Sequence, residues 1–259
     1  MGNSARLGQH FLVDEAAADA IVAAALAGPG KDVLEIGPGR GVLTSPLLDT
    51  GAHVTAVELD DRLYAKLGET LVPRGLTLMH ADFLVLDLAR LGAGPYTVVA
   101  NLPYAVGSPI LQRILSWAHW RDAVLMFQKE VALRLCAAPG CADYGLLTLS
   151  TLLWATADYL LEVPRTSFRP PPQVASGVVR LVRREKPLVA PEKQAAFFKL
   201  AKAAFAQRRK MAAPTIAAAL GRPRAEIEAA FERLGVDKSA RPENIPFEAW
   251  AALAGLAGQ

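Results

Sequence analysis

The sequence predicts an α/β fold, with a parallel sheet covered on both faces by helices, followed by a small all-helical domain. Short apolar runs alternate with helix-like stretches, a glycine-rich turn follows the first strong run, and strand-like runs stop near residue 183. The 259 residues are 52% hydrophobic and 20% charged, which is typical of a globular protein and argues against disorder.

Apolar runs bounded by turn residues predict the strands 33–36, 53–58, 76–79, 97–100, 123–127, 159–163 and 177–182. The helices expected around them span 16–27, 43–49, 62–71 and 109–117. A β-α unit of this kind, repeated along the chain, favours a doubly wound sheet.

A charged segment with a proline, 183–187, separates this region from stretches with helical apolar spacing. The helices expected there span 197–205, 215–220, 224–234 and 247–256. We therefore expect two domains, a catalytic domain over 1–183 and a helical domain over 184–259.

Charge and cysteine content exclude several classes of protein. The net charge is only +3, and Cys136 and Cys141 are too few for a disulfide framework or a four-ligand zinc site. Residues 1–13 are polar and contain no apolar signal-peptide core. We expect free thiols, no metal and a cytoplasmic location.

Three features predict a nucleotide-type cofactor site at the carboxyl ends of successive strands. Gly37 and Gly39 lie in a glycine-rich turn that permits close approach by a ligand, although Val42 departs from the dinucleotide fingerprint. Glu58 can accept hydrogen bonds from a ribose diol, and Asp82 from an adenine amine. Each has a structural alternative: a tight turn for the glycines, an exposed strand end for Glu58, and a helix N-cap or turn aspartate for Asp82.

The fourth strand ends in Asn101-Leu102-Pro103-Tyr104. The amine of adenine is a poor nucleophile, and the Asn101 amide oxygen with a following backbone carbonyl can accept hydrogen bonds from its two protons. Pro103 stiffens the turn, and Tyr104 offers a face for a base lifted from its stack. The structural alternative is a β-turn closed by an asparagine.

Phe168 lies on a proline-rich loop that ends at Val174. Such a stiff loop can bring a second aromatic ring to the other face of the base. The alternative is that Phe168 fixes the loop to the core.

Together these segments resemble the ribosomal RNA adenine dimethyltransferase family. The matching blocks cover nearly the full chain, at residues 8–12, 35–44, 57–60, 101–104, 143–145, 168–174 and 205–210. The resemblance implies a Rossmann-like class I fold that uses S-adenosyl-L-methionine. It also implies dimethylation at N6 of two adjacent adenosines near the 3′ end of 16S rRNA, within the 30S subunit or its precursor, by a protein we expect to be monomeric.

The resemblance also implies residue roles. Asn101, Leu102, Pro103, Tyr104 and Phe168 form the catalytic set. Cofactor contacts are implied for His10, Leu12, Gly37, Gly39, Glu58, Asp82 and Asn101. The chain departs from the family pattern at His10, usually Asn, at Gln173, usually Lys, and after Lys210.

Basic residues cluster near the predicted domain junction and predict a phosphate-binding strip. The residues expected to bind RNA are Arg183, Arg184, Arg208, Arg209 and Lys210. Solvated helix faces are the alternative.

Other functions remain open at this point. They are methylation of 23S rRNA, a role as a 30S assembly factor with dispensable catalysis, and a nicotinamide dehydrogenase, which Val42 disfavours.

Overall fold

The computed structural model describes residues 10–26, 28 and 30–256. The chain divides into two compact units, Met1–Leu133 with Thr156–Arg183, and Arg134–Ala155 with Arg184–Gln259. Residues 134–155, which the sequence analysis places in the first domain, group with the helical unit. The reason is that Tyr144, Leu149 and Leu153 are buried in the apolar cluster of that unit.

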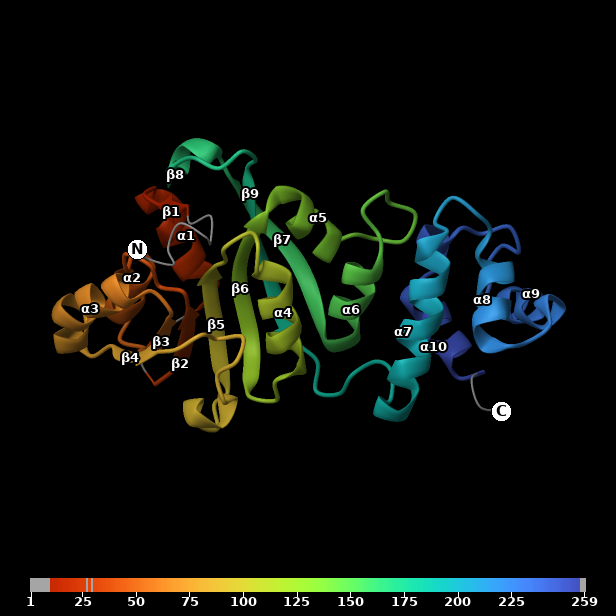
Figure 1. The fold of residues 1–259 in the computed structure, drawn as a ribbon, viewed down its shortest axis with the longest axis horizontal. Helices are drawn as coiled ribbons and strands as arrows, with labels where there is room; N and C mark the ends of the chain where they lie inside the picture. Colours follow the sequence, from red (N-terminus) through yellow and green to blue (C-terminus); the bar gives the residue numbers. More distant parts are fainter. Residues whose placement is uncertain (1–9, 27, 29, 257–259) are drawn as a thin grey trace. The chain divides into compact units, whose positions relative to one another are not determined.

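Seven strands of the described residues form the sheet of the first unit, in the order β4-β3-β2-β5-β6-β9-β7 (Figure 1). Their bounds are β2 Asp32–Ile36, β3 His53–Glu58, β4 Thr77–His80, β5 Tyr96–Asn101, β6 Trp120–Gln128, β7 Ala155–Val163 and β9 Ser176–Arg183. Every predicted strand is present within a few residues of its expected position.

The sheet is mixed rather than fully parallel. Strands β2 to β6 pair in parallel, whereas β9 runs antiparallel to β6, with Val124 opposite Arg180. The chain order reverses between the neighbours β2 and β5, and ligands of open α/β sheets bind at such a switch point, beyond the carboxyl ends of the strands.

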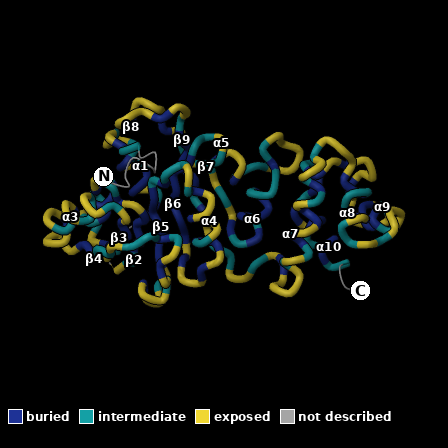
Figure 2. The backbone as a smooth tube through the Cα atoms, in the orientation of Figure 1, coloured by how far each residue is buried: buried dark blue, intermediate teal, exposed yellow. Residues whose placement is uncertain are grey.

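The helices of the first unit are α1 Glu15–Ala24, α2 Thr44–Asp49, α3 Asp61–Thr70, α4 Gly107–Ser116 and α5 Lys129–Leu135, which runs two residues past the unit boundary. Side chains of α1, α2 and α3 share one apolar cluster with Val33, Val54, Val99 and Val124. The pairing register places these four valines on one face of the sheet. Figure 2 shows the central strands buried along most of their length. The burial explains why these strands read as continuous apolar runs.

A second, two-stranded sheet was not predicted. Strand β1 (Phe11–Leu12) pairs antiparallel with β8 (Phe168–Arg169), so Leu12 lies opposite Phe168 (Figure 1). The Asp14 side chain accepts a hydrogen bond from Ala17 N at the start of α1 and another from Ser167 Oγ at 2.6 Å. These contacts attach the start of the described chain to the Phe168 loop.

The second unit is helical in the residues that the structure describes. Its helices are α6 Leu146–Trp154, α7 Pro191–Ala206, α8 Ala212–Leu220, α9 Arg224–Arg233 and α10 Phe247–Ala254. Their core contains the fully buried rings of Tyr144, Phe197, Phe231 and Trp250. Within the described ranges, no helix has the length and apolarity needed to cross a membrane, and no group of His, Cys, Asp and Glu side chains could hold a metal ion.

Candidate active site

One cavity of the first unit contains every residue that the sequence analysis assigns to catalysis or cofactor binding. Its empty volume is about 1170 Å³, part of it open to solvent. The predicted residues on its wall are His10, Leu12, Gly37, Gly39, Glu58, Asp82, Asn101, Leu102, Pro103, Tyr104 and Phe168. The cavity lies beside the ends of β2 and β5, at the switch point of the sheet.

The glycine-rich turn has the backbone shape that explains its composition. Gly37 and Gly39 have φ of +67° and +60°, a region that residues with a Cβ rarely adopt. A Cβ at Gly37 would meet nothing within 4 Å, so the space beside it is open to a ligand.

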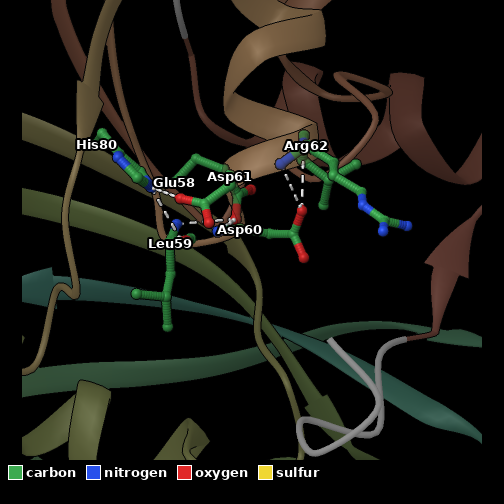
Figure 3. Close-up of polar contacts among 7 residues, drawn as sticks. Glu58, Leu59, Asp60, Asp61, Arg62 and His80 are labelled. Carbon is green, nitrogen blue, oxygen red and sulfur yellow. Dashed lines mark hydrogen bonds and ion pairs between the residues drawn. The ribbon is translucent and has the colours of Figure 1, made fainter. Parts of the chain in front are cut away.

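Glu58 at the end of β3 is buried and holds this turn in place. Its Oε2 accepts a hydrogen bond from Gly39 N at 3.0 Å. Its Oε1 accepts from Leu59 N and Asp60 N, both at 2.8 Å (Figure 3). Burial raises the pKa of Glu58 above its ordinary value, while these backbone donors act in the opposite direction. Glu58 is therefore not the simple exposed strand-end residue of the structural alternative.

Glu35, on β2 immediately before the glycine turn, is a cavity residue that the sequence analysis missed. It is 2% exposed, and its Oε2 has no hydrogen-bond partner among the described residues. Burial raises its pKa to about 8; Thr44 lowers the pKa and the nearby charge of Glu58 raises it further. The available signal was an acidic residue between Leu34 and Ile36 in an otherwise apolar strand.

Asp82 follows β4 and serves a turn as well as the cavity. Its Oδ1 accepts a hydrogen bond from Leu84 N at 2.8 Å. One of its two carboxylate oxygens therefore has the structural role of a turn aspartate. From α4, the Arg113 guanidinium donates to Leu86 O and lies 5.9 Å from the centre of the Phe83 ring. Arg113 thereby supports the loop that carries Asp82.

The Asn101 carboxamide has a fixed orientation. Its Nδ2 donates to His10 O at 3.3 Å, and among the described residues its Oδ1 has no hydrogen-bond partner. The Pro103 carbonyl accepts from Val106 N, whereas the Leu102 carbonyl has no partner within the described chain. Two acceptor oxygens are thus available at the end of β5, as the chemistry of an amine substrate requires.

Aromatic rings also line the cavity near this turn. The Tyr104 hydroxyl is 2.7 Å from Ser176 Oγ, and its ring centre is 5.6 Å from that of His10. Burial raises the pKa of Tyr104. Phe168 is only 1% exposed and belongs to the apolar core as well as to the cavity wall, so it fixes the loop to the core, as its alternative reading proposes.

The basic residues expected to bind RNA lie outside the cavity, and several contact the protein itself. Arg183 Nη1 donates to Ala118 O at 3.2 Å, and Arg184 Nε donates to Leu152 O at 3.1 Å. Arg208 donates to Ala142 O and lies 3.6 Å from a Glu243 oxygen. Arg209 and Lys210 are exposed.

Residues 2–257 match the model of the family described as "Ribosomal RNA adenine dimethylase". The chain belongs to this family. It is therefore an S-adenosylmethionine-dependent adenine dimethyltransferase of ribosomal RNA, and the dehydrogenase alternative is wrong.

Curated relatives and solved structures agree with this assignment. The chain is 41% identical over 249 residues to the ribosomal RNA small subunit methyltransferase A of Thiobacillus denitrificans, covering 96% of this chain and 95% of the relative. A protein of the same name from Phenylobacterium zucineum is 45% identical over 252 residues, covering 95% of this chain and 85% of the relative.

Two solved structures superimpose well on the chain. The 23S rRNA methyltransferase ErmE gives a TM-score of 0.78 at 28% identity, covering 96% of this chain and all of that one. A dimethyladenosine transferase from Plasmodium falciparum also gives 0.78, at 25% identity, covering 94% of this chain and 96% of that one. These neighbours share the Rossmann-like class I fold.

The cavity fits the cofactor of the family. The open glycine turn provides space, Glu58 lies at the strand end, and the buried Glu35 leaves one oxygen without a partner among the described residues, so polar atoms that a ligand can use line the cavity.

Proposed function

We propose that this chain methylates N6 of two adjacent adenosines near the 3′ end of 16S rRNA, in the 30S subunit or its precursor. Relatives named for the small subunit match 95% or more of this chain at about 40% identity or more. The solved enzyme named for 23S rRNA is 28% identical. The balance of similarity supports the small-subunit substrate over the 23S alternative.

The observation that carries the proposed chemistry is the orientation of Asn101. Because Nδ2 donates to His10 O, Oδ1 is the carboxamide atom that can accept a hydrogen bond from the target amine. The Leu102 carbonyl supplies a second acceptor from the rigid Pro103 turn. Hydrogen bonds to both amine protons leave the nitrogen lone pair directed at the methyl donor.

The cofactor, when bound, supplies an electrophilic methyl group on a sulfonium centre. We assign its contacts to Gly37, Gly39, Glu58 and Asp82, and those of its methionine part to His10 and Leu12, which lie on the same wall. Asn101 lies on the same wall, and we assign it to both ligands.

We assign the binding of the target base to Tyr104. Phe168 holds the loop that completes the cavity wall. The Tyr104 hydroxyl is held by Ser176, which fixes the plane of the ring. A base that leaves its stack can lie on such a ring. The nitrogen formed by methyl transfer is strongly acidic, so the reaction needs no dedicated base.

We assign rRNA recognition to the helical unit, with Arg209 and Lys210 as the exposed members of the predicted strip. The chain acts as a monomer in the cytoplasm, where small subunits are assembled. Arg184 and Arg208 donate to carbonyl groups of the helical unit, whereas Arg183, in the first unit, donates to Ala118 O of its own unit.

The test is methyl transfer to 30S subunits that lack the modification, with labelled cofactor and a nucleotide-resolution map. Wild type should label two adjacent adenosines, and Asn101→Ala should lower kcat by about 100-fold or more, the usual cost of losing a group that acts in the transition state. Asp87→Ala, in the turn before β5 and away from the cavity, is the control.

Each alternative has its own outcome. Label in 23S rRNA alone would overturn the substrate assignment. Tight 30S binding by wild type without turnover would instead indicate an assembly factor.

A further inference from the structure

Two exposed arginines, Arg40 and Arg169, lie beside Phe11, which lines the cavity, and a third, Arg165, lies in the loop just before β8. The roles assigned above do not use them. We call Arg40, Arg165 and Arg169, together with Phe11, the arginine rim. All four residues belong to the first unit. Figure 2 shows the chain around β8 as largely exposed.

The pairing of β1 with β8 determines which side chains the rim presents. Residues directly opposite in an antiparallel pair lie on the same face, so Leu12 shares a face with Phe168 and Phe11 shares the other with Arg169. Leu12 and Phe168 are 3% and 1% exposed. The Phe11–Arg169 face is therefore the outer one.

Arg40 extends this outer face from the glycine turn. Its guanidinium carbon lies 4.4 Å from the centre of the Phe11 ring, and both residues line the cavity. Phe11 also packs beside Gly39, where an added Cβ would approach its ring to 3.5 Å. One aromatic ring thus holds a guanidinium group next to the opening of the cavity.

The loop before and after β8 supplies the other two cations. Arg169 Nη1 donates to Thr166 O and Phe168 O, at 3.1 and 2.9 Å. Arg165 Nη1 donates to Gln173 O at 3.1 Å. In both side chains, therefore, most of the N–H donors remain available.

The rim lacks counter-charges. In the described part of the chain, none of its three arginines forms an ion pair with a carboxylate. Asp14 is the acidic residue bound to this loop, but Ser167 and the start of α1 occupy its carboxylate. Unpaired guanidinium forks around an aromatic ring match phosphodiester groups in charge and geometry.

We propose that the arginine rim binds phosphodiester groups of the RNA strand that flank the adenosine entering the cavity. This inference rests on the proposed function, because it requires a single RNA strand at the cavity. It assigns to the catalytic unit a phosphate contact of its own, next to the reacting base and separate from the basic residues of the helical unit.

The test compares variants that remove or keep the charge. The double variant Arg40→Gln/Arg169→Gln removes two charges, while glutamine can still donate to the loop carbonyls. The double variant Arg40→Lys/Arg169→Lys keeps both charges. Arg90→Gln is the matched control, since Arg90 is an exposed arginine of η3 (Leu88–Leu91), which precedes the amino end of β5, whereas the cavity lies at the carboxyl end of that strand. The measurements are kcat and KM for unmodified 30S subunits over a series of salt concentrations, and Kd for S-adenosylmethionine.

The glutamine pair should raise KM for 30S by on the order of 10-fold, and the plot of log affinity against log salt should become shallower by about 0.7 per arginine. The cofactor Kd should stay within about 2-fold of wild type. The lysine pair should keep the wild-type salt slope, and Arg90→Gln should match wild type.

An unchanged salt slope in the glutamine pair, with wild type active, would overturn the rim assignment alone. A weakened cofactor Kd with an unchanged KM for 30S would also overturn it, because Arg40 would then bind the cofactor carboxylate. An inactive wild type would instead count against the proposed function.

Discussion

Replacing Glu35 by glutamine isolates the effect of a buried carboxyl group on stability. Glu35 is 2% exposed, and Oε2 has no hydrogen-bond partner in the described part of the chain. The change Glu35→Gln keeps the size of the side chain and removes its ability to ionise. We expect the two proteins to respond differently to pH.

The sign follows from proton binding. The Glu35 pKa is about 8 in the folded protein and 4.5 when exposed, so the folded state holds its proton more tightly. This contribution to stability is complete below pH 4.5 and is lost as the pH rises through about 8. Between these two pH values, the unfolding free energy of wild type should fall by about 1.4 kcal/mol per pH unit because of this group, or by roughly 5 kcal/mol in total.

Urea denaturation at about pH 5, 7 and 9 measures the difference in unfolding free energy between wild type and Glu35→Gln. The unfolding free energy of the variant minus that of wild type should increase by roughly 4 kcal/mol from the lowest to the highest of these pH values. Glu69→Gln, an exposed site of α3, controls for the loss of a carboxylate elsewhere. A difference that stays constant with pH would refute the argument, because it would mean that Glu35 is ionised and hydrated in the fold.

Two further predictions concern the framework of the site. Gly41→Ala should lower the unfolding free energy, measured in urea, by about 1–3 kcal/mol, because φ is +81° and the new Cβ would lie 2.8 Å from Leu71 Cδ1. The control Gly68→Ala in α3, where a Cβ would meet nothing within 4 Å, should be neutral or stabilising. Equal losses of stability in the two variants would contradict this prediction. Asp14→Ala should cost about 0.5–2 kcal/mol through the α1 cap and raise protease sensitivity near Ser167; an unchanged cleavage pattern would show that the β1–β8 pairing does not need this contact.

Strands and site residues could be predicted because their signals are local. Each strand of the main sheet is an apolar run between turn residues, and the ends of β2, β3, β4 and β5 carry the glycine turn, Glu58, Asp82 and Asn101. In a parallel sheet these ends meet at one edge, so sequence order alone places the side chains together.

The missed features depend on contacts between distant residues or lack a periodic signal. The pairing of Phe11 with Arg169 joins two-residue strands far apart in the chain. Helix α6 is apolar on nearly all sides, so it shows no helical period. Strand direction is not encoded in hydropathy either, which is why the antiparallel β9 was not expected.

Charge patterns in the sequence do not show which contacts a charged side chain makes within the protein. Arg208 stands in a basic run that suggests RNA binding, yet it donates to Ala142 O and lies beside Glu243. Glu35 was counted as part of a motif, although its burial makes it a titrating group of the cavity.

The β1–β8 pairing has a consequence for synthesis on the ribosome. The glycine turn and the Asn101 turn leave the exit tunnel long before Phe168, the residue that pairs with Leu12 and completes the cavity wall. A nascent chain shorter than this point lacks Phe168 and the strand that pairs with β1, so this part of the cavity wall forms only after the proline-rich loop has been translated.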